Sequence, residues 1–138
     1  MMSAAIDYNA INILIVQYMG WDIWLAQKSR PYDLVRLPKQ FQTIYGPNNA
    51  VPYREIRYDK LAFHKSWEWL MPVIEKIETS TVYTINATYD SDIECIGWRP
   101  NIMCIDDKDE ICPGLVTLRF NIKIDAMYFA VATYIFHH

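Results

Sequence analysis

Apolar residues recur three and four positions apart in three stretches of this chain, which is the spacing of one face of a helix. The first stretch is Ile6–Met19, the second is Ser66–Glu78, and the third is Asp125–Phe136. Each is about as long as a helix in an ordinary globular protein. The pattern therefore predicts three helices.

Residues that favour helix ends stand at the boundaries of the first two stretches. Ser3 or Asp7 can cap the start of the first helix, and Gly20 follows its end, where a left-handed C-cap residue belongs. Ser66 is the natural N-cap of the second helix. Pro72 lies inside that helix and lacks a backbone donor, so we expect it to bend or loosen the first turns.

The second helix has an apolar stripe and a charged face. The stripe consists of Trp67, Leu70, Met71, Ile74 and Ile77, and the charged face consists of Glu68, Glu75, Lys76 and Glu78. We expect Trp67 to pack against a sheet. Trp69 lies about 200° around the helix from Trp67. Trp69 is therefore either covered by another part of the chain or exposed to a partner.

Three later stretches have the character of strands. Thr81–Tyr89 and Ile93–Trp98 are rich in β-branched and aromatic residues, and Asp90-Ser91-Asp92 between them reads as a turn. Pro100 is expected to end the second strand, and residues 100–114 to form an exposed loop. Leu115–Ile122 alternates between apolar and polar residues. Together these stretches predict a three-strand antiparallel meander.

Prolines and turn residues interrupt the segment 26–58, which has no helical pattern. Within it, Phe41–Tyr45 and Tyr53–Tyr58 can pair as a hairpin. The apolar residues that precede the segment are expected to fold back onto the first helix as core; they are Trp21, Ile23, Trp24 and Leu25. The expected fold is therefore α+β: an antiparallel sheet with this possible extra hairpin, packed with about three helices in a sandwich-like arrangement, in a single domain over residues 1–138.

One long string in the chain resembles a phage protein family. Phe63–Glu78 reads FHKSWEWLMPVIEKIE, and the earlier triplet Met19-Gly20-Trp21 ends the first helix. With the last helix at Ile124–Phe136, these features resemble the phage ABA-sandwich group of small proteins from phages and prophages of gut bacteria. The likeness covers roughly two-thirds of the chain, outside 26–58 and 100–114. It implies an accessory phage protein of a family without an assigned activity, and no catalytic residues are carried over.

Composition sets the expected compartment and cofactors. No apolar run reaches the roughly 18–20 residues that a membrane-spanning helix needs, and no positive charge precedes the first apolar stretch as in a secretory signal, so we expect a protein of the bacterial host cytoplasm. The three cysteines, Cys95, Cys104 and Cys112, are spaced unlike a structural zinc site. His64 or His137-His138 could complete four ligands on paper, but we expect buried thiols, no metal and no cofactor.

Charge is distributed unevenly along the chain. Residues 23–65 hold eight basic and three acidic side chains, a balance of +5, so the remainder carries −8 within the total of −3. Basic and aromatic residues alternate in this region, as in proteins that bind single-stranded nucleic acid. The candidate binding residues are Arg30, Tyr32, Arg36, Lys39, Arg54, Arg57 and Tyr58, together with Trp69 of the second helix. A mixed loop packed over a core would have the same composition, and this alternative is favoured.

Catalytic patterns are weak by comparison. His64 lies beside Ser66, but no third residue that would orient a base accompanies them, so capping explains Ser66 better. The acidic groups Asp90, Asp92, Glu94 and Asp106–Glu110 read as solvated turns, because neither matches a calcium-binding loop. We therefore expect a non-enzymatic protein that binds another macromolecule, and we expect that macromolecule to be a protein. The alternatives are single-stranded nucleic-acid binding through residues 30–58 and, last, a small enzyme around His64. Oligomeric state is left open.

Overall fold

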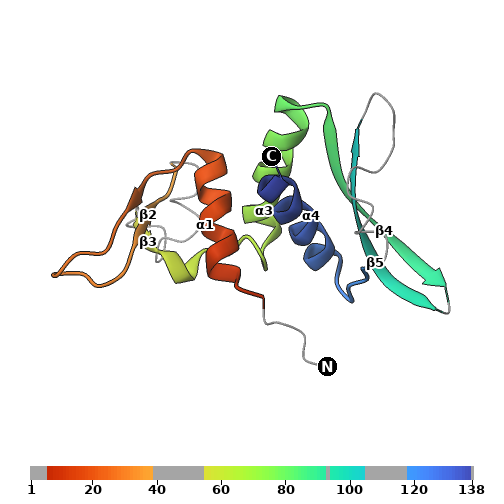
Figure 1. Ribbon diagram of the computed structural model, residues 1–138, viewed down its shortest axis with the longest axis horizontal. Helices are drawn as coiled ribbons and strands as arrows, with labels where there is room; N and C mark the ends of the chain where they lie inside the picture. Colours follow the sequence, from red (N-terminus) through yellow and green to blue (C-terminus); the bar gives the residue numbers. More distant parts are fainter. Residues whose placement is uncertain (1–5, 39–54, 93, 105–117, 138) are drawn as a thin grey trace. The chain divides into compact units, whose positions relative to one another are not determined.

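A computed structural model describes residues 6–38, 55–92, 94–104 and 118–137 (Figure 1). Within these residues the chain forms three α-helices, a three-stranded antiparallel sheet and a β-hairpin packed against helices, so the predicted α+β class is confirmed. Two compact units divide the chain, Met1–Leu61 and Ala62–His138. The single domain over residues 1–138 stays a prediction, and the two units are described one at a time.

The first unit begins with helix α1, Tyr8–Met19, as the sequence predicts. Asp7 is the N-cap, and its carboxylate accepts the N–H of Ala10 at 3.1 Å. Gly20 ends the helix with a φ of 77°, which lies in the left-handed region that glycine adopts without strain. The predicted helix and its C-cap are therefore confirmed, while Ser3 lies outside the described residues.

A short sheet follows α1 in the order β1-β2-β3, with β1 at Ile23–Trp24, β2 at Leu34–Arg36 and β3 at Glu55–Arg57. Both pairings are antiparallel, and the buried Val35 of the central strand pairs with residues on either side of it. The predicted strand Tyr53–Tyr58 is thus partly confirmed, but its described partner is β2. Phe41–Tyr45 lies outside the described residues.

Two of the residues expected in the core are at the surface. Trp24 is exposed, and Leu25 is 71% exposed. Ile23 and Trp24 are neighbours on a strand, so their side chains point to opposite faces of the sheet, and only one face can be covered. The expectation that these residues pack on α1 is therefore wrong for Trp24 and Leu25.

A turn of 3-10 helix, η2 at Tyr58–Lys60, lies near the end of the first unit and packs against α1. The side chain of Asn12 is fully buried, and its amide donates a hydrogen bond to the carbonyl of Leu61 at 3.2 Å. A buried amide without such a partner would destabilise the fold. This bond therefore fixes the middle of α1 against the chain that leaves η2.

The second unit begins with helix α3, Trp67–Ser80. Its buried face consists of Trp69, Leu70, Val73, Ile74 and Ile77. Trp67 is 39% exposed and Met71 is also exposed, because both lie on the same side of the helix as Glu75 and Glu78. The prediction that Trp67 packs on the sheet is wrong. Trp69 occupies the interior instead, at 0% exposure.

Helix α3 begins after Ser66, as predicted, but the side chain of Ser66 does not cap the helix. Ser66 is the N-cap residue, yet its hydroxyl makes no capping hydrogen bond. The Ser66 carbonyl accepts the N–H of Leu70 at 3.0 Å, which opens the regular helical bonding. Pro72 lies within the helix as predicted, and it leaves the Glu68 carbonyl without the usual donor four residues later.

The hairpin consists of β4, Tyr83–Asp92, and β5, Cys95–Cys104. It is longer than predicted, because Asp90-Ser91-Asp92 belongs to β4 and the strand β5 continues through Pro100. Proline is tolerated there because every second residue of an edge strand points its N–H away from the partner strand. Trp98, two residues earlier, donates its N–H outward to Phe120, so the missing donor of Pro100 falls on this outer edge.

The predicted third strand, Leu115–Ile122, is not a strand over its described part. Phe120 forms an isolated bridge with Trp98, and helix α4 begins at Lys123 and runs to His137. Residues 115–117 lie outside the described chain, as does the part of the predicted 100–114 loop that follows Cys104. Among the described residues, the three-stranded sheet is the one formed by β1, β2 and β3 in the first unit.

Helices α3 and α4 cover one face of the hairpin (Figure 1). The hairpin contributes the buried side chains of Ile85, Ala87 and Ile102, and α4 contributes Ala130 and Val131 among others. Two layers result, which agrees with the predicted sandwich-like packing. In the parts of the chain described above, no helix combines the length and apolar character needed to cross a membrane.

Candidate functional site

The basic and aromatic residues predicted to bind nucleic acid lie in the first unit, where Arg30 has a structural role. Gln27 and Arg30 pair across a tight turn that closes the β1–β2 hairpin. The Arg30 guanidinium donates to the carbonyls of Trp24 at 3.4 Å and Leu25 at 3.0 Å, and also to that of Tyr32. Most of its donors are therefore used inside the hairpin.

Arg57 of β3 meets Tyr32, which lies two residues before β2. The Arg57 guanidinium carbon lies 4.7 Å from the centroid of the Tyr32 ring, and its Nε lies 3.0 Å from an oxygen of Asp59. A cation over an aromatic face is a favourable contact, and the exposed ion pair adds little to stability. Arg57 is therefore already paired with an acid as well as a ring.

The other predicted binding residues are dispersed. Arg36 is exposed at the end of β2, and Tyr58 is half-buried in η2. Lys39 and Arg54 lie outside the described residues. Trp69 is fully buried in the second unit, so it cannot present a binding surface. The prediction that Trp69 is a binding residue is therefore wrong. Within the described part of the predicted set, Arg30 and Arg57 both lie over the ring of Tyr32.

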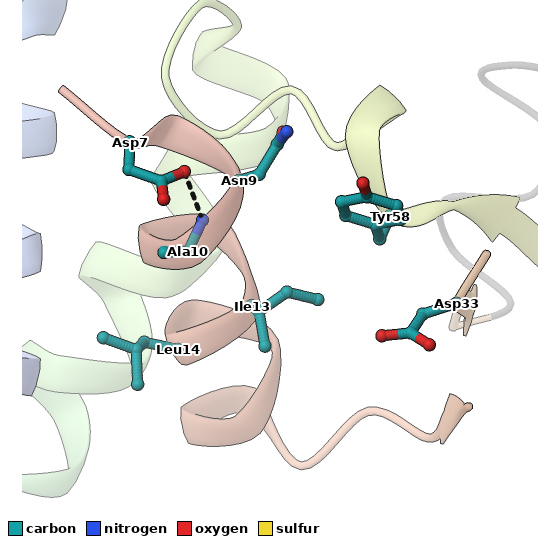
Figure 2. Close-up of a pocket in the computed structure, with 7 residues that line it drawn as sticks. All are labelled: Asp7, Asn9, Ala10, Ile13, Leu14, Asp33 and Tyr58. Atoms are coloured by element: carbon teal, nitrogen blue, oxygen red, sulfur yellow. Dashed lines mark hydrogen bonds between the residues drawn. The ribbon is translucent and has the colours of Figure 1, made fainter. Parts of the chain in front are cut away.

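An open pocket of about 570 Å³ lies beside α1 in the first unit (Figure 2). Its walls come from three elements: the first two turns of α1 with the N-cap, the residue that precedes β2, and η2. The lining residues are Asp7, Asn9, Ala10, Ile13, Leu14, Asp33 and Tyr58. Of these, only Tyr58 belongs to the predicted binding set.

Backbone hydrogen bonds hold both carboxylates of this pocket in position. Asp7 accepts the N–H of Ala10 at 3.1 Å, and Asp33 accepts the N–H of Ala26 at 2.7 Å. Among the described residues neither carboxylate forms a salt bridge. The pocket therefore presents two fixed negative charges beside the apolar side of α1.

The second unit has an aromatic surface near the end of its hairpin. Tyr89 and Trp98 are cross-strand partners whose ring centroids lie 5.4 Å apart at 68°. Tyr89 is 51% exposed, and Ile96, two residues from Trp98 on β5, is 60% exposed. The Lys123 ammonium lies 5.4 Å from the Trp98 ring centroid. We call Tyr89, Ile96 and Trp98 the hairpin face.

A network of charged and polar side chains braces the same part of the hairpin. Asp90 accepts from Arg99 at 3.4 Å and from Arg119 at 2.8 Å. Arg99 also donates to Asn101 at 2.9 Å, whose amide donates to Thr88 at 2.8 Å. The expectation that Asp90 lies in a solvated turn is therefore wrong, because two arginines distant in sequence pair with it within the strand.

His64, the candidate catalytic base, is half-buried at the start of the second unit. Its ring meets that of Tyr128 edge to face, with centroids 5.9 Å apart. Burial lowers the pKa of His64, the nearby Lys65 lowers that pKa further, and Asp125 opposes them. The described pocket lies in the first unit and does not include His64.

Metal-binding chemistry has no visible basis in the described chain. In residues 6–38, 55–92, 94–104 and 118–137, no three side chains of the ligating types gather. Cys95 and Cys104 are free thiols at opposite ends of β5. Cys112 and the acidic stretch Asp106–Glu110 lie outside this part of the chain.

Comparisons with known proteins give no relative from which a role could be inferred. No protein-family model, curated protein or solved structure matches the chain. The assignment of a function therefore rests on the arrangement of its own side chains, above all on the hairpin face and the pocket.

Proposed function

We propose that the chain is a phage- or prophage-encoded accessory protein that acts in the host cytoplasm by binding another protein, without catalysis of its own. The observation that carries the binding role is the hairpin face, where Tyr89 and Ile96 are more than half exposed beside Trp98. The phage setting rests on the resemblance of the Phe63–Glu78 string.

The composition of the hairpin face suits protein recognition. Tyrosine and tryptophan are enriched among the residues that dominate binding energy at protein interfaces, since they bury a large area and lose little side-chain freedom. Lys123 lies over Trp98 and adds a cation at the margin. The exposure of these neighbouring apolar side chains supports an interaction site at this end of the hairpin.

The underlying backbone holds the hairpin face rigidly. Phe120 exchanges two backbone hydrogen bonds with Trp98, of 2.7 and 2.9 Å, and the ion pairs of Asp90 connect β4 with Arg119. A surface that is ordered before binding loses less entropy when the partner docks. The rings of Tyr89 and Trp98 are thus presented in one arrangement.

The alternative of single-stranded nucleic-acid binding has less support from geometry. It would use Arg30 and Arg57 as phosphate contacts, but Arg30 donates to three carbonyls and Arg57 is paired with Asp59. Binding would therefore require these internal contacts to be given up. Arg36, an exposed cation at the end of β2, favours this alternative.

Site-specific photocross-linking in bacterial cells tests the proposed function. A photoreactive phenylalanine analogue replaces Tyr89 in one variant and Phe136, which is exposed at the end of α4, in a control variant. We expect one discrete protein adduct from position 89 that is absent from position 136. Either the same adducts at both positions or none at position 89 would contradict the proposal.

A parallel measurement separates the two binding classes. A labelled single-stranded oligonucleotide is titrated with the purified protein at low salt, where phosphate contacts are strongest. The proposal predicts no salt-dependent binding. Salt-dependent binding that Arg36→Ala weakens and Tyr89→Ala leaves unchanged would favour the nucleic-acid alternative.

A further inference from the structure

We infer that the outer edge of β4, near the end of the hairpin, accepts an extended segment of a partner protein as an additional strand. This inference rests on the proposed protein-binding function and deepens it by naming the backbone conformation and side-chain pattern of the partner. Its supports are the direction of the backbone groups of β4, the side chains that close part of its outer edge, and the hairpin face beside the open part.

The register of the hairpin decides which backbone groups of β4 point outward. Trp98 donates to and accepts from the backbone of Phe120, at 2.7 and 2.9 Å, so its own N–H and C=O point away from β4. Tyr89 is the cross-strand partner of Trp98, so this pair is not joined by backbone hydrogen bonds, and such pairs alternate with hydrogen-bonded ones. The residues whose N–H and C=O groups point to the outer edge of β4 are therefore Tyr83, Ile85, Ala87, Tyr89 and Ser91.

Side chains close the first part of this outer edge. The first three outward N–H groups each donate to a side-chain oxygen, at distances of 3.1, 3.1 and 2.8 Å. The pairs are Tyr83 with Thr81, Ile85 with Glu78, and Ala87 with Asn86. A strand edge whose donors are already bonded is a poor template for another chain. The first part of β4 is therefore unsuited to strand addition.

The same edge is open at Tyr89 and Ser91. Among the described residues, no group bonds to the backbone N–H or C=O of either residue, and both residues are exposed. On the other edge of the hairpin, Phe120 already occupies the level of Trp98. Figure 1 shows this end of the hairpin away from α3 and α4. Unpaired N–H and C=O groups on alternate residues match the backbone of an extended segment, which adds to the sheet as a new strand.

Neighbouring side chains define the pattern of the incoming segment. Residues directly opposite each other on paired strands lie on the same face of the sheet. The partner residues opposite Tyr89 and Ser91 therefore lie on the side of the hairpin face, where the Tyr89 ring is 51% exposed. Apolar side chains suit both positions, and the small Ser91 leaves room for a large one. The residue between them lies on the opposite face, beside the ion pairs of Asp90, so a polar side chain suits it.

A second copy of the chain is a less suitable occupant of this edge. If β4 paired with β4 of another copy about a two-fold axis at Asp90, the two Asp90 carboxylates would lie directly opposite each other. Like charges in that position destabilise a sheet. We therefore expect the purified protein to sediment as a monomer. A dimer that Ser91→Pro abolishes would contradict the inference, because the edge would then serve self-association.

Selection from a displayed library of random linear peptides tests the inference without the cellular partner. Each enriched peptide is titrated with two variants of one position. Ser91→Pro removes the outward N–H, whereas Ser91→Ala keeps it and removes only the hydroxyl. We expect peptides with apolar residues at alternate positions, which bind Ser91→Ala as they bind the unmodified protein and bind Ser91→Pro at least about tenfold more weakly. No enriched peptide, or equal binding to both variants, would overturn the inference.

Hydrogen exchange tests the inference without any substitution. In the unmodified protein the outward amides of Tyr89 and Ser91 should exchange fast, and a bound peptide should slow both. The amide of Thr88 points toward β5 and is the internal control, so its exchange should not change. This measurement stands even if Ser91→Pro fails to fold. Unchanged exchange at Tyr89 and Ser91 with peptide bound would show that the peptide does not add to this edge.

The two proposals fail in distinguishable ways. If cross-linking from position 89 yields a partner but selected peptides leave the exchange of the Tyr89 and Ser91 amides unchanged, strand addition is wrong and protein binding stands. If the peptides slow exchange at these amides but position 89 gives no specific adduct in cells, the edge accepts strands and the proposed cellular function is wrong.

Discussion

The rings of Phe63 and Trp69 meet edge to face, with centroids 5.1 Å apart and an interplanar angle of 87°. Both side chains are fully buried; Phe63 lies in the turn that leads into α3, and Trp69 lies in the first turn of that helix. Edge-to-face aromatic pairs add to the free energy gained from burial alone. This pair therefore fixes the start of α3 in the interior of the second unit.

Replacement of the buried tryptophan should be far more costly than replacement of its exposed neighbour. Trp69→Ala removes a fully buried indole and is expected to lower the free energy of unfolding by about 3–5 kcal/mol. Trp67→Ala, on the exposed side of the same helix, should cost less than about 1 kcal/mol. Urea denaturation measures both, and a larger loss in Trp67→Ala would show that the helix faces are assigned wrongly.

Loss of the Arg30 guanidinium should loosen the β1–β2 hairpin. Arg30→Lys keeps the charge but cannot reach the carbonyls of Trp24 and Leu25 together, so we expect a loss of about 1–2 kcal/mol in the free energy of unfolding. Hydrogen exchange should accelerate at the amide of Gln27. Lys28→Ala, at an exposed residue of the same turn, is the control. No difference between the two variants would refute this role of Arg30.

Two glycine substitutions distinguish steric contact from backbone strain. Gly97 has a φ of 135°, and a Cβ there would lie 2.8 Å from the Phe120 carbonyl oxygen. Gly97→Ala should therefore cost about 2–3 kcal/mol, from strain and from displacement of the Trp98–Phe120 bridge. Gly20→Ala meets no atom within 4 Å and should cost about 1 kcal/mol from strain alone. The reverse order in thermal or urea unfolding would contradict this account of the bridge.

Stability should decrease as the pH falls through the range in which His64 titrates. Burial holds the pKa of His64 below its ordinary value of 6.5, so below that pH the unfolded chain binds a proton more readily than the folded one. The free energy of unfolding is thus highest above pH 6.5 and declines toward the lowered pKa. His64→Gln should decline less between pH 7.5 and 5.5. An equal decline in both proteins would mean that His64 does not contribute.

The helices, which depend on local sequence, could be predicted. Which side of each helix is buried could be predicted only in part. Helices α1, α3 and α4 follow from apolar spacing and from residues such as Gly20, because both act within a few positions of the chain. The buried side of α3 was also readable, since Trp67 and Met71 share a direction with Glu75 and Glu78. Apolar spacing includes Trp67 in the stripe with Leu70 and Ile74, but the charged Glu75 and Glu78 on its side of the helix indicate that this side is exposed.

Features that depend on distant residues could not be predicted from the sequence. Asp90 looks like a turn residue, but Arg99 and Arg119 pair with it and keep it in β4. The pocket likewise joins Asp7, Asp33 and Tyr58 from three elements, and no sequence spacing shows that these residues meet. Tertiary packing sets both arrangements, so local propensity carries no signal for them.

The affinity of the cross-linked partner for hairpin-face variants tests the central claim most directly. The partner is purified and titrated with the unmodified protein, with Tyr89→Ala and Ile96→Ala, and with Leu25→Ala as a control at an even more exposed apolar residue in the first unit. The account predicts that each hairpin-face variant binds at least about tenfold more weakly, while Leu25→Ala binds as the unmodified protein does. Unchanged affinity in both hairpin-face variants would contradict it.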